Sequence, residues 1–341
     1  MSKQAKPNID INPNTQVAAK TMVETRHHAR QFNLTSIKKA SSAISGLHDS
    51  RFRGRGMDYQ ESRIYQAGDD IRNMDWRVTA RTGDPHTKLF QEERERPIYL
   101  VVDTNSSLKF GTKTQFKSVL ASKVAALLGW SSVQQGDRIG VLTYGINGVH
   151  IGKATAGKRG MMAMISHLIK AFDPNNQQIS EQHSSEQHNL DQALKQLRTI
   201  IRPGSLVILV SDFYALGDDA KKHLLQLRKH NDVLAIKVSD PFENHMPLPA
   251  LYGVITEQRP RVLDSKNSRM RDKLQAKQQN HIQSLKDNII KAGVPLIPIL
   301  TNDAWVNALK NGLSNPNLAF SHWLGSLTET HESRVQQGGG Q

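Results

Sequence analysis

Short apolar runs alternate with helical periodicity from residue 97 onward. Five segments are apolar and rich in β-branched residues, which is typical of buried strands: 97–102, 138–144, 205–210, 233–238 and 294–300. Between them, apolar residues recur every three or four positions, which predicts helices: about 116–135, 161–172, 190–201, 218–230 and 268–292. Strands that alternate with helices predict a doubly wound, mostly parallel α/β sheet covered on both faces.

Turn and cap signals lie between these elements. Asn147-Gly148 predicts a hairpin turn, residues 250–264 read as a small hairpin, and Gly293 is suited to cap the last long helix. We divide the chain accordingly: a flexible N-terminal arm (1–30), a segment rich in Arg, Asp and Glu that packs on the sheet (31–96), an α/β domain (97–301), and a C-terminal helix with a disordered tail (302–341).

Polar side chains follow two of the predicted strands. Asp103, Asn105 and Ser107 come directly after the first strand, and Asp212 follows the third. The carboxyl ends of the strands are where an open α/β sheet places its ligand site. Oxygen donors of this kind suit Mg²⁺, Mn²⁺ or Ca²⁺. The alternative is structural, because an Asp in this position also caps the following helix or turn.

Composition narrows the class of protein. The hydrophobic content is 37%, cysteine is absent, and no apolar run approaches the roughly 18 residues that span a bilayer. We therefore expect a protein of the cytoplasm without disulfides or zinc–thiolate sites. The net charge of +14 favours either a solvated basic surface or a polyanion partner. Specific nucleic-acid binding is not expected, because no basic run is interleaved with aromatic residues.

The segment before the first strand has a different character. Residues 51–96 contain ten basic and nine acidic side chains, and nine of the ten cations are Arg. Arg forms planar bidentate pairs with carboxylates, which Lys cannot. The structural interpretation is a salt-bridged subdomain, and the functional one is a docking surface or anion clamp. Gly54-Arg55-Gly56 is too isolated to predict a phosphate-binding loop.

These residues carry a family resemblance. The following blocks resemble the bacterial "domain of unknown function 58" family: Gly54-Arg55-Gly56, Arg63-Ile64-Tyr65, Gly68-Asp69-Asp70-Ile71-Arg72, Met74-Asp75-Trp76-Arg77, Ala80-Arg81, Lys88-Leu89-Phe90 and Glu92-Glu93-Arg94-Glu95-Arg96. The match continues through Asp103 and Phe110-Gly111-Thr112. It marks these positions as family-motif residues with a structural or docking role: Arg63, Tyr65, Gly68, Asp69, Asp70, Arg72, Asp75, Trp76, Arg81, Glu92, Glu93, Arg94 and Glu95.

The resemblance implies a von Willebrand factor A type fold. It also implies a metal-ion-dependent adhesion site built on Asp-x-Ser-x-Ser, with a Thr and an Asp from two further loops. Asp103, Ser107 and Asp212 match that pattern, whereas Asn105 replaces a Ser and His188 stands where the Thr is usual. The implied cofactor is Mg²⁺ or Mn²⁺ held by an altered, degenerate site.

The implied function is a non-enzymatic protein-interaction module. Members of this family resemble partners of MoxR-type AAA+ ATPases and of other A-domain proteins, in assembly, maturation or stress-linked remodelling of other proteins. One alternative is a metal-dependent phosphohydrolase with Asp103 as nucleophile, although Asn105 cannot supply the acid that such chemistry wants two residues on. The other alternative is charge-driven binding of a polyanion, which would weaken steeply with salt.

Overall fold

The computed structural model describes most of the chain as two compact units. The described residues are 12–32, 34, 57–66, 68–92, 97–145, 147–173, 190–214, 216–217, 219–244, 250–256, 259–302 and 304–335. Residues 1–46 and 97–341 belong to one unit, here the α/β unit, and residues 47–96 to the other, here the ribbon unit. Each unit is described by itself.

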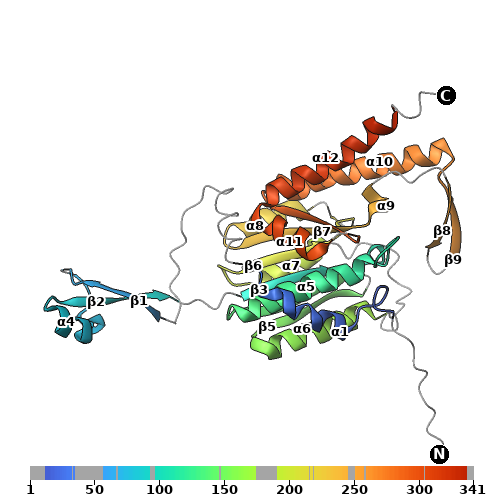
Figure 1. Cartoon of the computed structure of the whole chain (residues 1–341). Coiled ribbons are helices and arrows are strands. Elements are labelled where there is room, and N and C mark those ends of the chain that lie inside the picture. Colours follow the sequence, from blue (N-terminus) through green and yellow to red (C-terminus); the bar gives the residue numbers. More distant parts are fainter. Residues whose placement is uncertain are drawn as a thin grey trace, which may run out of the picture. The chain divides into compact units, whose positions relative to one another are not determined.

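The α/β unit is built on a six-stranded sheet in the order β10-β7-β6-β3-β4-β5 (Figure 1). The strands are as follows: β3 (Pro97–Asp103), β4 (Arg138–Gly145), β5 (Gly148–Ala156), β6 (Leu206–Ser211), β7 (Asp232–Ser239) and β10 (Leu296–Leu300). All neighbours pair in parallel except β5, which returns antiparallel to β4 through the turn at Gly148. Within this sheet the chain forms β3 first, continues to β4 and β5 on one side of it, and then crosses to β6 on the other side. The predicted doubly wound, mostly parallel sheet is confirmed.

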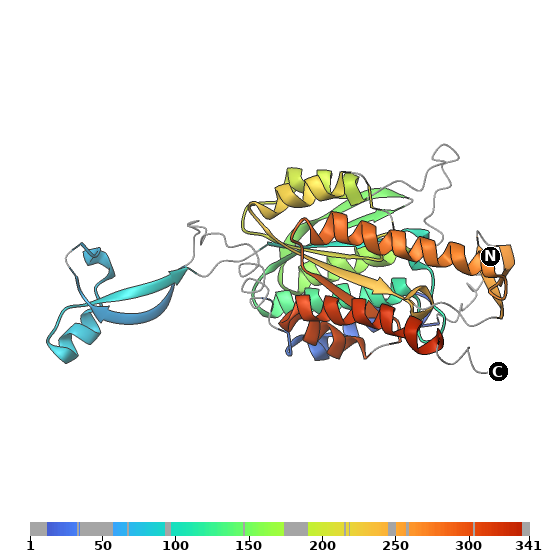
Figure 2. The same cartoon turned by 90° about the horizontal axis from the view of Figure 1, so that it is seen from above.

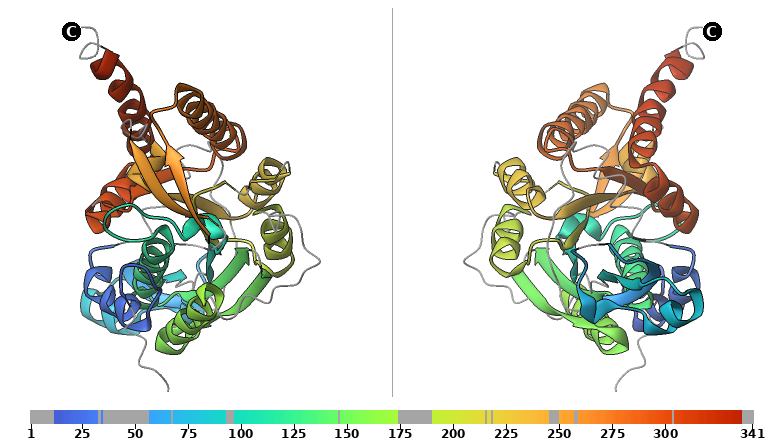
Figure 3. Two further views of the ribbon diagram at one scale, coloured as in Figure 1. Left: turned by 90° about the vertical axis from the view of Figure 1, so that its right-hand side faces the viewer. Right: turned by 90° about the vertical axis from the view of Figure 1, so that its left-hand side faces the viewer.

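Helices cover both faces of this sheet (Figure 3). One apolar layer involves α1 (Ala19–Glu24), α2 (Arg26–Ala29), α5 (Lys117–Gln134), α6 (Gly157–Phe172) and α11 (Trp305–Ser314). The other involves α7 (Leu190–Ile200), α8 (Ala220–Arg228), α10 (Ser268–Leu285) and α12 (Pro316–Val335). Neighbouring strand residues alternate between the layers: Leu100 faces the first and Val101 the second.

Smaller elements complete the α/β unit. They are η2 (Ser106–Leu108), α9 (Pro241–Asn244), the antiparallel pair β8 (Leu251–Thr256) and β9 (Arg259–Asp264), and the π-helical turn η4 (Lys286–Ile290). The predicted hairpin is therefore confirmed. Gly293 has a φ of 72°, so it supplies the left-handed conformation expected just after the long helix.

The expectation of a flexible arm over residues 1–30 is corrected for its described part. Met22 and Ala29 of this segment, and Phe32 just after it, are buried in the first apolar layer. The indole of Trp130 on α5 donates to the Met22 carbonyl at 3.1 Å, and the Ser131 hydroxyl donates to the Phe32 carbonyl at 2.9 Å. A few apolar residues in a polar stretch predict no buried element from sequence. In the structure, however, these residues pack against α5 in the first apolar layer. Residues 1–11 lie outside the described part.

The ribbon unit pairs β1 (Met57–Ile64) with β2 (His86–Glu92) in antiparallel register (Figure 2). Between the strands lie the 3₁₀ turn η1 (Ile71–Asn73) and the short helix α4 (Trp76–Thr82). The carboxylate of Asp75 caps α4 by accepting from the Val78 N–H at 3.1 Å, and Gly83 ends it at a φ of 85°. The expectation that this segment packs on the sheet stays a prediction.

None of the described helices combines the length and the apolar character that crossing a bilayer requires.

The close packing of α11 on β10 gives a test of the fold. A Cβ added at Gly312 would run into the Ile297 side chain, whereas one added at Gly325 on α12 would meet nothing within 4 Å. We expect Gly312→Ala to lower the free energy of unfolding by about 1–3 kcal/mol through overpacking. Gly325→Ala should leave it unchanged or raise it by up to about 1 kcal/mol through helix propensity. Urea denaturation of both variants checks this, and equal effects would contradict the packing described.

Candidate functional site at the carboxyl edge of the sheet

The carboxylate of Asp103 ends β3 in a fully buried position at the switch point between β3 and β6. Its Oδ1 accepts from the backbone N–H and the side-chain amide of Asn105, at 2.9 and 2.8 Å. Its Oδ2 accepts from the hydroxyls of Ser211 and Tyr144, at 2.5 and 3.3 Å. Four protein donors therefore saturate this carboxyl group.

Burial dominates the protonation of Asp103. Removal from solvent and the nearby charge of Asp212 raise the pKa of Asp103 to about 7, against the opposing hydrogen bonds from Ser211 and Asn105. A carboxyl group with this pKa changes charge near neutral pH. Protonation of Asp103 near neutral pH therefore limits the negative charge at this edge of the sheet.

Asp212 follows β6 and is also fully buried. Its Oδ1 accepts from the Tyr214 N–H at 3.1 Å, and its carboxylate also accepts from the Ser107 hydroxyl. Both strand-end Asp residues therefore bond a backbone N–H two residues on, as the turn-capping interpretation predicts. Asp103 and Asp212 also interact electrostatically, with Asn105 bonded to Asp103 and Ser107 bonded to Asp212, so the four predicted residues lie at the same edge of the sheet.

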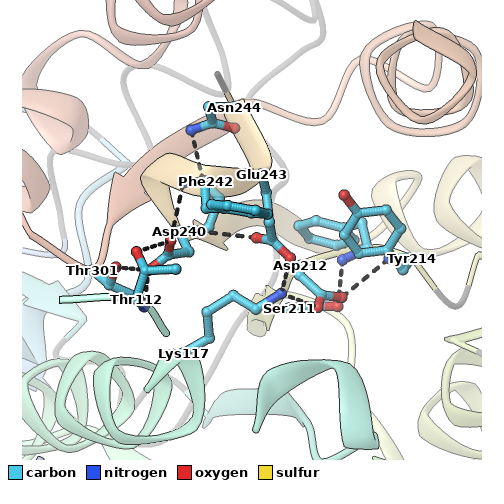
Figure 4. Close-up of polar contacts among 12 residues, drawn as sticks. Thr112, Lys117, Ser211, Asp212, Tyr214, Asp240, Phe242, Glu243, Asn244 and Thr301 are labelled. Carbon is cyan, nitrogen blue, oxygen red and sulfur yellow. Dashed lines mark hydrogen bonds and ion pairs between the residues drawn. The ribbon is translucent and has the colours of Figure 1, made fainter. Parts of the chain in front are cut away.

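The ammonium of Lys117 is the cation in direct contact with Asp212, and the buried Lys237 also interacts electrostatically with Asp212 and Glu243. The Lys117 side chain is fully buried, and its Nζ lies 2.8 Å from Asp212 Oδ2 and 2.6 Å from Glu243 Oε1. Figure 4 shows it reaching from α5 between the two carboxylates. The rings of Phe110 and Tyr214 lie 5.9 and 5.5 Å from the same nitrogen, within cation–π range. The ammonium is thus enclosed by two carboxylates and two aromatic rings.

The Lys117–Asp212 contact sets the ionisation of both partners. Burial alone would lower the pKa of Lys117, but Asp212 and Glu243 more than offset it and hold the pKa above its usual range. Burial alone would raise the pKa of Asp212, but the Lys117 charge and hydrogen bond hold it below its usual range. Both groups are charged at neutral pH, and each depends on the other to stay so in a dry interior.

A further carboxylate, Asp240 after β7, fixes the loop that follows Asp103. Its oxygens accept from the Thr112 N–H at 3.0 Å and from the Thr112 hydroxyl at 2.6 Å. They also accept from the Thr301 hydroxyl beyond β10, at 2.6 Å (Figure 4). Gly111 is needed beside Thr112, because a Cβ there would collide with the Gln115 carbonyl. The loop is therefore tied to the ends of two further strands.

Phe213 marks local strain at the same edge. It has a φ of 60°, in the left-handed region that bulky residues avoid, and it is the one described residue other than Gly with a positive φ. Its N–H donates to the Ser211 hydroxyl at 2.8 Å. Strained backbone of this kind costs about 1–3 kcal/mol and concentrates at functional sites. The turn it makes leaves Asp212 aimed at Lys117.

The predicted ligands do not fit a divalent cation in this arrangement. Asp103 is saturated by donors, the Asn105 amide donates to it, and Asp212 is engaged by Lys117. A metal ion would lie beside an ammonium and would have to displace hydrogen bonds to gain its oxygens. Among the described side chains, no three His, Asp or Glu residues are grouped as a metal centre. Asp103 also offers no open oxygen for nucleophilic attack.

Sequence reasoning missed Lys117, Glu243 and Asp240. Asp240 could have been found, because it follows β7 as Asp103 follows β3. Lys117 gave no local signal, since one cation at the start of an apolar helix reads as a solvated residue. Its partners come from β6 and α9, 95 and 126 positions away in the chain. The second-loop position His188 lies outside the described residues.

The family-motif residues lie in the ribbon unit and fall into two groups. The first group makes turns and caps: Asp69 pairs with Arg63 at 2.7 Å, Asp70 caps η1, Asp75 caps α4, and Gly68 has a φ of 109°. Tyr65 is half-buried, and its N–H donates to the Pro85 carbonyl at 2.8 Å. The second group is Arg72, Trp76 and Arg81, all exposed. Glu92 ends β2, and Glu93, Arg94 and Glu95 lie outside the described residues.

Fold and strand-end site define a doubly wound α/β protein, and sequence comparison gives its family. The chain belongs to the family described as "Protein of unknown function DUF58", which matches residues 61–284. It is 30% identical over 287 residues to the uncharacterized protein Rv1480 of Mycobacterium tuberculosis, covering 81% of this chain and 85% of that one. The uncharacterized protein Mb1516 of Mycobacterium bovis matches equally well.

Solved structures with a similar arrangement include two bacterial proteins. The conserved hypothetical protein BatB from Bacteroides thetaiotaomicron is 11% identical, with a TM-score of 0.39, covering 65% of this chain and 98% of that one. A von Willebrand factor type A protein from Catenulispora acidiphila is 10% identical, with a TM-score of 0.37, covering 68% and 44%.

The buried ion pairs of Lys117 give a test with a defined pH dependence. In Lys117→Met, Asp212 and Glu243 stay in place without their cation, so the free energy of unfolding should fall by about 3–5 kcal/mol at pH 8. Without the ammonium, burial raises the folded-state pKa of Asp212 above its unfolded value. The folded variant then binds a proton more tightly than the unfolded chain, so its stability falls as pH rises.

The stability gap between wild type and variant should therefore be widest near pH 8 and narrow toward pH 5. Guanidinium denaturation at both pH values measures it. Lys113→Met removes an exposed cation from the same edge and should change stability by less than about 0.5 kcal/mol. A pH-independent gap, or a loss no larger than that control's, would contradict the role given to Lys117.

Proposed function

We propose that this protein is a non-enzymatic protein-interaction module, and that it contacts its partner through the loop of residues 104–114 at the carboxyl edge. As the family resemblance implies, the proposed partner is a MoxR-type AAA+ ATPase. The two would act together in assembly, maturation or stress-linked remodelling of other proteins.

The observation that carries this proposal is that buried side chains hold the loop and the start of α5 in place. Lys117 joins α5 to Asp212 and Glu243, and Asp240 holds both polar atoms of Thr112. A loop held by hydrogen bonds to Asp240, next to the buried ion pairs of Lys117, loses little conformational freedom on binding, which favours a stable contact. Nothing in the arrangement supports turnover, because Asp103 is buried and saturated.

The chemistry of the rim indicates what the loop would accept. Ser106, Lys109, Lys113 and Thr114 are exposed on this loop. The rim thus combines hydroxyl donors with two cations and offers no exposed carboxylate between residues 104 and 114. It is suited to an acidic side chain of the partner, held by rim charge rather than by a metal ion.

The rim is tested by charge reversal in the full-length chain. Lys109→Glu with Lys113→Glu should weaken binding to the purified MoxR-type ATPase of the same genome by about tenfold, mainly through the association rate. Lys158→Glu with Arg159→Glu is the matched control. These exposed residues begin α6, after the end of β5 that pairs with Arg138, and so lie at the opposite edge of the sheet. If both double variants weaken binding equally, the exposed lysines of the loop are not the binding site.

Metal independence is tested with the ATPase kept nucleotide-free, so that chelation acts on this protein alone. Because Lys117 supplies the charge, the dissociation constant measured by fluorescence anisotropy should change by less than about twofold between 5 mM MgCl₂ and 5 mM EDTA. Binding that needs Mg²⁺ would instead support a metal-dependent adhesion site at Asp103 and Asp212. Failure of the ATPase to bind in either buffer would refute the proposed partner.

A further inference from the structure

Three described carboxylates of the ribbon unit make turns, helix caps and one ion pair. Asp69 holds Arg63 at 2.7 Å, Asp75 accepts from the Ser62 hydroxyl at 2.8 Å while capping α4, and Asp70 caps η1. These carboxylates build turns and caps instead of neutralising the remaining cations. The salt-bridged interpretation of this segment therefore accounts for Arg63 but not for the arginines of α4.

One side of α4 is fully presented to solvent. Trp76, Arg77, Ala80 and Arg81 are all exposed, and their spacing places them on neighbouring rows of one helix face. Trp76 is 67% exposed, which is high for an indole. Among the side chains that the structure describes, Arg77 and Arg81 have no ion-pair partner. We refer to these four residues as the arginine face.

The ribbon unit has no apolar core of its own within its described part. No apolar side chain described between residues 57 and 92 is buried, and Ile64 and Ile71 are 60% and 65% exposed. A two-stranded ribbon is at best marginally stable without a covered apolar face. Local polar bonds shape the described part of this unit, while Ile64, Ile71 and Trp76 are exposed.

We propose that the arginine face, with Ile71 beside it in sequence, docks onto an acidic and partly apolar surface of another protein. Trp and Arg are the residue types that most often dominate binding energy at protein interfaces, and aliphatic side chains add burial around them. The guanidinium groups would pair with carboxylates in the planar bidentate mode. This surface belongs to the ribbon unit, and the proposal does not depend on the function proposed for the carboxyl edge of the α/β unit.

Charge argues for a foreign acidic partner over this chain itself. Residues 47–96 contain ten basic and ten acidic side chains, so the remainder of the chain carries the whole excess of +14. On the basis of net charge, neither the α/β unit nor a second copy is, on average, a favourable partner for Arg77 and Arg81. A nucleic acid could pair its phosphates with the arginines and stack a base on Trp76. It would not, however, provide an apolar surface to cover Ile64 and Ile71.

The experiment places a photo-crosslinking benzoylphenylalanine at Ala80 of the full-length protein in its host. Crosslinked peptides are then identified by mass spectrometry. We expect peptides of another protein, rich in Asp and Glu, and the same product should be lost in Arg77→Glu with Arg81→Glu. Lys158→Glu with Arg159→Glu changes the net charge equally and should keep it. Titration of that purified protein should show about tenfold weaker binding or more for Trp76→Ala, which leaves charge unchanged.

Circular dichroism of each full-length variant checks that the protein remains folded, as expected for substitutions at exposed positions. Crosslinks to residues 97–341 of the same chain, to a second copy or to nucleic acid would each overturn the proposal. So would an absence of crosslinks, a partner peptide without acidic residues, or loss of the product in the control pair. All of these outcomes leave the ATPase binding measured at the carboxyl edge unaffected, so the two proposals fail separately.

Discussion

The arrangement at the carboxyl edge depends on one buried ammonium between two carboxylates. Lys117 reaches from α5 to Asp212 and Glu243, at 2.8 and 2.6 Å. Taking these charges out of water is costly, and only their mutual contact with good geometry offsets that cost. Any movement of α5 away from the ends of β6 and α9 would leave a charge unpaired. This constraint holds the helix, the strand ends and the loop above them in one arrangement.

The same interaction separates this site from one built around a metal ion. In a metal site the positive charge comes from solvent and leaves with chelation, whereas here it is part of the chain. Asp103 fits this arrangement, because burial and the charge of Asp212 raise its pKa to about 7 and limit further negative charge. The strained turn at Phe213 and the Asp240 bonds to Thr112 complete a rigid base beneath an exposed, basic rim.

The elements that could be predicted from the sequence are those defined by a local pattern of apolar and turn residues. Strands ending at Asp103 and Asp212, the helices between them and the cap at Gly293 all follow from periodicity and turn chemistry. The convergence of the two Asp residues followed from the geometry of parallel strands. The cation they face did not, because its identity depends on contacts 95 and 126 positions apart. The burial of Met22 against α5 was missed for the same reason, since its partner is remote and its own surroundings are polar.

The measurement that tests the central claim most directly is a crystal structure of the wild-type protein grown in MnCl₂, with anomalous data at the manganese edge. The account predicts an ammonium of Lys117 between Asp212 and Glu243, and no anomalous peak in contact with Asp103, Ser107 or Asp212. A manganese peak bound by those oxygens, with Lys117 swung away from them, would contradict it.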